Sequence, residues 1–208
     1  MPDDIRFGLT GYGLSGRHHA IAISAAPGAV LSAIACDSDT TAAAAWRDFP
    51  AVPVHVGYEA LLTRPDVNAV AIVVPNHLHA KVGVAALRAD KDVLLEKPMA
   101  TTLEGCDQLL QAAHESGRVL TIGHELRLST QFGRIKSLID AGEIGTPNYL
   151  SFSLFRFPFR LGSQGWRETV PNMGVEQPAG PRPGRQQHVR RDLLVLFSPQ
   201  VWDGLPSG

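Results

Sequence analysis

Apolar runs and amphipathic segments alternate along the chain up to about residue 157. Short apolar runs, several rich in β-branched residues, predict strands at 5–10, 29–37, 68–76, 92–98 and 118–124. Segments with helical periodicity lie at 14–26, 39–48, 58–67, 79–90, 103–117 and 132–145. This alternation favours right-handed βαβ crossovers. We therefore expect an α/β fold with a doubly wound parallel sheet of the Rossmann type, covered on both faces.

The pattern changes at residues 146–159, where the side chains alternate between two distinct faces of one longer predicted strand. We interpret it as the first strand of a second, α+β sheet domain. The segment 174–208 differs again, with five prolines, five glycines, four arginines and one short apolar run at 193–197. We therefore expect a first domain at 1–124, the start of a second at 125–173, and an irregular tail at 174–208.

Charge and composition exclude several classes of function. A formal net charge of -1 over 208 residues gives no bulk electrostatic reason to expect a nucleic-acid partner. No apolar run approaches the ~20 residues that span a bilayer, and the acidic N-terminus does not resemble a signal peptide. The two cysteines, Cys36 and Cys106, lack metal-ligand spacing. We expect a reduced, cytoplasmic protein without a metal site or membrane contact.

A glycine pattern, G-x-G-x-x-G, directly follows the first predicted strand and opens the first helix. Gly11 would allow a tight turn, Gly13 would let the backbone approach a pyrophosphate, and Gly16 would let helix and strand pack closely. Tyr12 and Leu14 lie between these glycines, and the helix N-terminus offers N–H groups to a phosphate. The alternative is an ordinary glycine-rich turn, but the strand and helix in register favour a dinucleotide site.

Asp37 closes the second predicted strand about 20 residues after the glycine pattern. A carboxylate at this position can accept hydrogen bonds from the adenosine ribose hydroxyls. It would also repel a 2'-phosphate, so the sequence favours NAD over NADP as the cofactor.

Polar residues follow the most apolar predicted strand, at 68–76. Ligands of open parallel sheets bind outside the carboxyl ends of the strands, so we expect Pro75, Asn76 and His79 beside the nicotinamide half of the cofactor. For His79, a local hydrogen bond at the start of a helix is an equally good interpretation. The same choice applies to His77, with less support.

The strand predicted at 92–98 ends in the charged pair Glu96 and Lys97. Burial of either charge alone is costly, so the pair indicates partners at the carboxyl end of the sheet. A lysine beside a nicotinamide ring can polarise a substrate hydroxyl and take its proton, and partial burial would lower its pKa. A solvated salt bridge in a loop is the alternative.

These motifs in this order resemble one family. The segments "GYGLSGRHH", "CD", "VVPNHLHAKVGVAAL", "KDVLLEKPMATT" and "IGHELRL" are similar to those of the Gfo/Idh/MocA oxidoreductases, the NAD(P)-dependent glucose–fructose oxidoreductase, inositol dehydrogenase and related sugar and cyclitol enzymes. The resemblance covers roughly residues 5–168. It implies a dinucleotide-binding first domain and hydride transfer between NAD(H) and a secondary alcohol or ketone of a sugar, cyclitol or related polyol.

The resemblance also implies residue roles. Lys97 would be the catalytic lysine, and Arg127 would lie near the nicotinamide. His18 would match the histidine that follows the third glycine, in a structural role. The residues implied to bind the cofactor are Gly11, Tyr12, Gly13, Leu14, Gly16, Asp37, Pro75, Asn76, His79, Glu96, Lys97 and Arg127.

The match ends after the segment 165–174. Family members are longer, and their second domain forms substrate contacts, supplies an Asp-x-x-x-His pair and mediates homo-oligomers; here His188 and Asp192 have the wrong spacing. We therefore expect a chain shortened or frame-shifted at its C-terminus. The alternative function is a catalytically incomplete NAD-binding fragment or a binding or regulatory module. A short-chain dehydrogenase is disfavoured because the chain has no Tyr-x-x-x-Lys.

Overall fold

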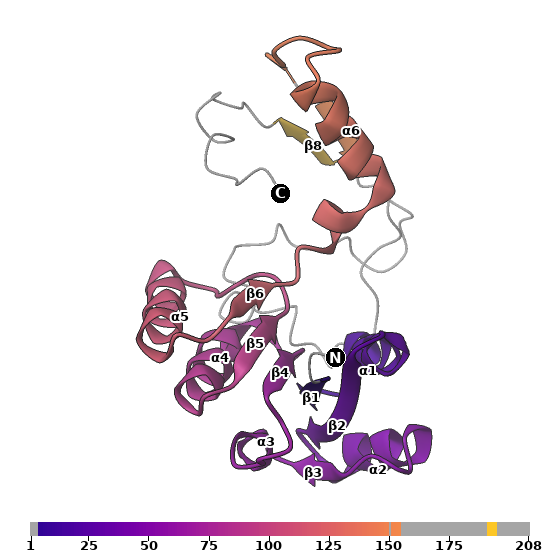
Figure 1. The fold of residues 1–208 in the computed structure, drawn as a ribbon, viewed down its shortest axis with the longest axis vertical. Helices are drawn as coiled ribbons and strands as arrows, with labels where there is room; N and C mark the ends of the chain where they lie inside the picture. The colour runs from indigo at the N-terminus through magenta and orange to yellow at the C-terminus, as the bar shows by residue number, and fades with distance from the viewer. Residues whose placement is uncertain (1–3, 150, 155–190, 195–208) are drawn as a thin grey trace, which may run out of the picture. The chain divides into compact units, whose positions relative to one another are not determined.

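The computed structural model describes residues 4–149, 151–154 and 191–194 (Figure 1). The chain divides into two compact units, and the described residues of the first end at His124. The second unit begins at Glu125. The domain limits expected from the sequence, 1–124, 125–173 and 174–208, otherwise stay predictions.

The first unit contains a six-stranded parallel sheet in the order β3-β2-β1-β4-β5-β6. The strands are β1 (Ile5–Thr10), β2 (Ala29–Cys36), β3 (Val54–Val56), β4 (Ala69–Ile72), β5 (Asp92–Leu95) and β6 (Leu120–Ile122). The chain builds outward from β1 to β3, then returns to continue from β4 on the other side of β1. This order confirms the predicted doubly wound α/β fold.

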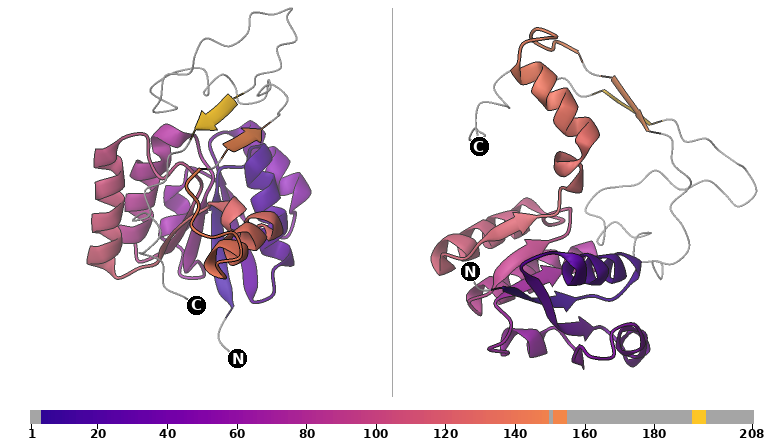
Figure 2. Two further views of the ribbon diagram at one scale, coloured as in Figure 1. Left: turned by 90° about the horizontal axis from the view of Figure 1, so that it is seen from above. Right: turned by 45° about the vertical axis from the view of Figure 1, so that its right-hand side comes forward.

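Helices cover the two faces of this sheet (Figure 2). They are α1 (Leu14–Ala25), α2 (Asp39–Asp48), α3 (Glu59–Leu62), α4 (His79–Arg88) and α5 (Leu103–Ser116). Neighbouring residues of β2 show the two faces: Ile34 packs into one hydrophobic cluster with α1 and α2, while Ala33 and Ala35 pack into another with α3, α4 and α5. Successive strand residues point to opposite faces, so the sheet is buried on both sides, as a parallel sheet requires.

Local sequence signals explain the limits of α2 and α5. Ser38 caps α2 through a capping box with Thr41, and Thr102 accepts a hydrogen bond from the N–H of Gly105 at the start of α5. Gly117 ends α5 in the left-handed conformation, with φ 65°. These caps lie where the apolar periodicity starts and stops, so the predicted limits of α2 and α5 agree closely with the observed ones. The helix predicted at 58–67 is shorter, because α3 ends at Leu62, and the one predicted at 132–145 ends at Asp140.

One strand of the sheet was not predicted. β3 has three residues between Pro53 and Gly57, and it pairs with the end of β2. A run of this length carries no measurable alternation, so only its pairing in the folded sheet identifies it. The predicted strand at 92–98 is also too long, because β5 ends at Leu95 and leaves Glu96 and Lys97 in the following loop.

The second unit contains the 3-10 turn η2 (Glu125–Leu128), helix α6 (Thr130–Asp140) and the antiparallel strands β7 (Ser151–Leu154) and β8 (Arg191–Leu194). Helix α6 begins two residues before the expected start because Ser129 caps it. The strand expected at 146–159 is described over 151–154. Residues 191–194, in the expected irregular tail, form a strand that pairs antiparallel with β7. Residues 146–149 are described and do not belong to the strand, so the prediction began too early; residues 150, 155–190 and 195–208 lie outside the described residues.

Candidate dinucleotide site at the carboxyl edge of the sheet

The loops after β1, β4 and β5 leave the sheet at the same edge, since the strands are parallel and adjacent. β1 and β4 flank the point at which the strand order reverses. This switch point is where open α/β sheets bind their ligands. It brings together the glycine loop, the segment 73–79 and the Glu96–Lys97 pair, as the sequence predicted.

At two positions of the loop, neighbouring backbone atoms lie so close that only glycine fits. Gly11 has φ +90°, and a Cβ there would lie 2.1 Å from the carbonyl oxygen of Val73, in the loop after β4. A Cβ on Gly16, in the first turn of α1, would lie 2.0 Å from the carbonyl oxygen of Gly11. No side chain fits at either position. The two glycines thus pack α1 tightly against the turn and the turn against the neighbouring strand.

Gly13 differs from the other two, because a Cβ at this residue would meet no atom within 4 Å. It is the N-cap residue of α1, and it provides no side chain to bond the first N–H groups of the helix. Leu14 follows it with 77% of its surface exposed. An open backbone beside an uncapped helix N-terminus fits a pyrophosphate group, which would accept those N–H bonds.

Tyr12 points away from this opening. Its side chain is buried, its hydroxyl donates to Oδ2 of Asp48 at 3.0 Å, and its ring packs edge-on against Phe49. Burial and the neighbouring Asp48 carboxylate raise the pKa of Tyr12 to about 12. The side chain therefore anchors the glycine loop to the end of α2, which would leave only the backbone of Tyr12 for contact with a cofactor.

Asp37 lies at the end of β2, where the sequence placed the ribose site, and its side chain is exposed. Its Oδ1 accepts hydrogen bonds from the hydroxyls of Thr41 at 2.7 Å and Ser38 at 3.3 Å. Both bonds orient the carboxylate at the start of α2. A carboxylate has two acceptor oxygens, so Oδ2 could accept further donors, such as the hydroxyls of a ribose.

The loop after β4 places Pro75 and Asn76 at the same edge, with Asn76 buried at the start of a 3-10 turn (Asn76–Leu78). His79 is enclosed, with 1% of its surface exposed. Its Nε2 lies 3.0 Å from the carbonyl oxygen of Val74, and its Nδ1 lies 2.5 Å from that of Pro98. The geometry agrees with the local hydrogen-bond interpretation: the ring joins the loops after β4 and β5.

The Glu96–Lys97 pair is held by a residue that the sequence did not single out. Nε2 of His19, on α1, lies 2.9 Å from Oε1 of Glu96, and Oε2 of Glu96 accepts a hydrogen bond from the backbone N–H of Lys97 at 3.0 Å. The hydrogen bond from His19 lowers the pKa of Glu96, and the charge of Lys97 adds to the effect. The Lys97 side chain is exposed at the edge of the sheet.

The structural role predicted for His18 belongs to its neighbour His19. His18 is exposed, whereas His19 contacts the carboxylate of Glu96. His19 follows Gly16 by three positions, which places both on the same side of α1. That spacing is the signal that separates the two histidines. Arg127 lies in η2 of the second unit, so its predicted place near the nicotinamide stays a prediction.

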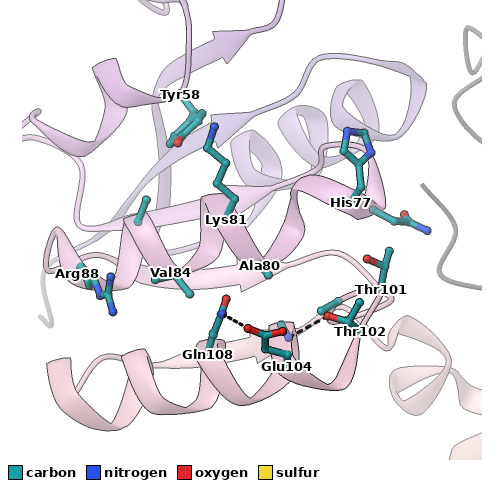
Figure 3. A pocket seen from close by; sticks show the side chains of 14 residues that line it. Tyr58, His77, Ala80, Lys81, Val84, Arg88, Thr101, Thr102, Glu104 and Gln108 are labelled. Carbon is teal, nitrogen blue, oxygen red and sulfur yellow. Dashed lines mark hydrogen bonds between the residues drawn. The ribbon is translucent and has the colours of Figure 1, made fainter. Parts of the chain in front are cut away.

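A separate groove of about 750 Å³ lies on the outer side of the first unit, between α4 and α5 (Figure 3). Its walls carry Lys81 and Arg88 from α4, and Glu104 and Gln108 from α5. Asn76 alone among the predicted site residues borders it. The glycine loop, Asp37 and Lys97 do not line this groove, so its size does not identify the cofactor site. Within the described residues, no group of three His, Cys, Asp or Glu side chains could hold a metal ion.

Comparison with known proteins identifies the family. A family model described as "Oxidoreductase family, NAD-binding Rossmann fold" matches residues 5–124, which span the whole sheet and its loops. The chain belongs to the Gfo/Idh/MocA oxidoreductases. The expected fold and the expected family are therefore both confirmed.

Curated relatives agree with this assignment. The chain is 34% identical over 199 residues to an uncharacterized oxidoreductase, YdgJ, of Escherichia coli, covering 95% of this chain and 55% of the relative. That match therefore extends past Gly174. The chain is also 34% identical to an inositol 2-dehydrogenase of Salmonella typhimurium over 69% of this chain and 44% of the relative. The chain spans about half the length of these curated relatives.

Solved structures show the same fold. A scyllo-inositol dehydrogenase from Lactobacillus casei matches with a TM-score of 0.67 and 26% identity, over 73% of this chain and 46% of the other. A 3-ketoreductase from Actinomadura kijaniata, crystallised with TDP-benzene and NADP, matches with a TM-score of 0.67 and 33% identity, over 76% of this chain and 50% of the other. No helix within the described residues is long and apolar enough to cross a membrane.

Proposed function

We propose that this protein is an NAD-dependent oxidoreductase that transfers a hydride between NAD(H) and a secondary alcohol or ketone of a sugar, cyclitol or related polyol. The observation that carries the proposal is the open backbone at Gly13 beside the uncapped N-terminus of α1, with Lys97 at the same edge of the sheet. The names of the relatives, an inositol 2-dehydrogenase and a 3-ketoreductase among them, support this substrate class.

Different residues of the site would bind different parts of the dinucleotide. The turn at Gly11 and Gly13 would hold the pyrophosphate through backbone N–H groups and the positive end of the α1 dipole. Asp37 would accept the hydroxyls of the adenosine ribose through Oδ2. Pro75 and Asn76 lie in the loop after β4 and would border the nicotinamide half.

Lys97 would carry the proton chemistry. When bound, the nicotinamide accepts or donates the hydride at its C4 atom, and the protein supplies orientation and electrostatics. The amine of Lys97 would take the hydroxyl proton at Nζ during oxidation and return it during reduction. Glu96 has both carboxylate oxygens engaged, by His19 and by the Lys97 N–H. Its role would therefore be to fix the loop that carries the lysine.

Two measurements test this function. NADH fluorescence measures binding, and a panel of cyclitols, sugars and sugar alcohols tests reduction of NAD at 340 nm. We expect binding together with turnover of at least one polyol, and loss of turnover but not of binding in Lys97→Met. Binding without turnover of any polyol would support the alternative, an NAD-binding fragment or module. Absence of binding would overturn both.

Asp37 is proposed to select NADH over NADPH, because its carboxylate would repel a 2'-phosphate. We expect Asp37→Ala to weaken NADH binding by about tenfold, the loss of one to two hydrogen bonds to a charged acceptor. Binding of NADPH should stay unchanged or improve. Asp39→Ala, an exposed neighbour in the first turn of α2, is the matched control. Equal Kd changes for both cofactors in Asp37→Ala would contradict this assignment.

A further inference from the structure

His19 connects two parts of the first unit that are far apart in the sequence. It lies on α1, one turn after Gly16, while Glu96 follows β5, and the two residues are separated by 77 positions. Gly16 permits this connection, because its missing side chain lets α1 approach the strand ends closely. The imidazole and the carboxylate meet at 2.9 Å with about a quarter of each side chain exposed.

The direction of the hydrogen bond follows from the chemistry of its two partners. An ionised carboxylate only accepts, so Nε2 of His19 carries the hydrogen in this contact. The other oxygen, Oε2, accepts the backbone N–H of Lys97. Glu96 is thus held at both oxygens, and its own N–H donates to the carbonyl oxygen of Ile72 in β4. The backbone on which Lys97 is carried is therefore attached to α1 through one side chain.

We propose that His19 is a positioning residue for Lys97: it orients the Glu96 carboxylate, which in turn holds the Lys97 backbone at the carboxyl edge of the sheet. This inference adds a residue to the proposed site. Only the expected effect on turnover rests on the proposed function, because the positioning of Lys97 can be tested without turnover. The same helix presents its N-terminus to the pyrophosphate, so α1 aligns the cofactor and the lysine together. No contact between His19 and a ligand is involved.

The adjacent histidine provides a matched control. His18 has the same chemistry and the same helix, but it is exposed. His19→Ala removes the donor to Glu96, His19→Gln replaces it with an amide N–H, and His18→Ala changes only the neighbouring surface. Thermal unfolding of each variant identifies any that fails to fold, and NADH binding shows whether the glycine loop is intact.

The deciding measurement is NMR of the whole chain, because it needs no turnover. In His19→Ala we expect the carboxyl carbon of Glu96 to titrate at a higher pH than in the wild type, and the Lys97 amide resonance to move. In His18→Ala both signals should match the wild type, and His19→Gln should restore the Lys97 amide position. If both signals in His19→Ala match the wild type, or if His18→Ala changes them equally, the proposal is wrong.

Turnover supplies the functional half of the test. On any polyol that the wild type oxidises, we expect His19→Ala to lower kcat by about tenfold with little change in KM for NAD, because displacement of a reacting group costs rate and not cofactor binding. A rise in KM with kcat unchanged would overturn the positioning role. If the wild type oxidises no polyol, the proposed function fails while the NMR result still decides whether His19 positions Lys97.

Discussion

The three glycines of the loop after β1 differ in the structural reason for the absence of a side chain. Gly11 combines a positive φ with a backbone contact that excludes a Cβ, and Gly16 excludes one by contact alone. At Gly13 neither a positive φ nor a close contact excludes a Cβ. Nothing in the folded protein itself therefore requires a glycine there. The G-x-G-x-x-G spacing therefore contains two positions at which the fold requires glycine and one, Gly13, for which we propose that a bound ligand does.

Alanine substitutions should separate these demands. We expect Gly13→Ala to change the free energy of unfolding by less than about 1 kcal/mol but to weaken NADH binding at least tenfold. Gly11→Ala should destabilise the protein by more than about 3 kcal/mol, since strain and a clash add. Urea unfolding and NADH titration measure both effects.

Gly28→Ala is the control for backbone strain, because Gly28 has φ +76° and open space around it. It should cost about 1–2 kcal/mol and leave NADH binding unchanged. A Gly13→Ala variant that binds NADH as well as the wild type would show that the pyrophosphate does not lie at this position.

At the scale of elements, two buried side chains connect the segments next to adjacent strands. His79, at the start of α4, joins the loop after β4 to the loop after β5. Lys91 donates from Nζ to the carbonyl oxygens of Arg64 and Val67, near the opposite ends of the strands. Lys91 therefore donates to two backbone oxygens, and the ring of His79 lies within hydrogen-bond distance of two others.

The role of His79 predicts a stability effect. His79→Leu fills a similar volume but removes every donor, so we expect a loss of about 2–3 kcal/mol in the free energy of unfolding. His77→Leu, at an exposed position in the same turn, should change it by less than about 0.5 kcal/mol. Chemical unfolding followed by circular dichroism measures both. Equal losses would show that the two carbonyl oxygens find other donors.

At the scale of the whole molecule, pH acts on stability through groups whose pKa differs between the folded and unfolded chain. The pKa of Glu96 is lowered by folding, so its contribution is present at neutral pH and is lost as the pH falls through the folded value. The pKa of Tyr12 is raised to about 12, so its contribution is complete below its ordinary pKa near 10 and is lost as the pH rises toward 12.

Tyr12→Phe should reveal the alkaline part. At pH 7 we expect the variant to be less stable than the wild type by about 1 kcal/mol, because the bond to Asp48 is lost. Above pH 10 the difference should shrink, since the wild type alone must keep the phenol protonated in the fold. Urea unfolding from pH 7 to 11.5 measures it, with Tyr149→Phe, at an exposed position, as the control. A difference independent of pH would contradict the raised pKa of Tyr12.

The sequence by itself determined the class of the fold and the residues of the proposed site that lie at one edge of the sheet. The order of strands and helices follows from local periodicity. The glycine pattern, Asp37 and the Glu96–Lys97 pair can be recognised by their spacing relative to the predicted strands. Parallel strands then bring these residues to one edge of the sheet.

Only the tertiary structure shows which side chains hold the loops of that site in place and which point toward its opening. β3 is defined by its pairing with β2, and the contact of Tyr12 with Asp48 joins residues 36 positions apart. His19 rather than His18 meets Glu96, and the ring of His79 is enclosed between two loops. Each of these facts is a contact between residues that are distant in the sequence. Packing between residues distant in sequence leaves no periodic signal, so local reasoning cannot supply it.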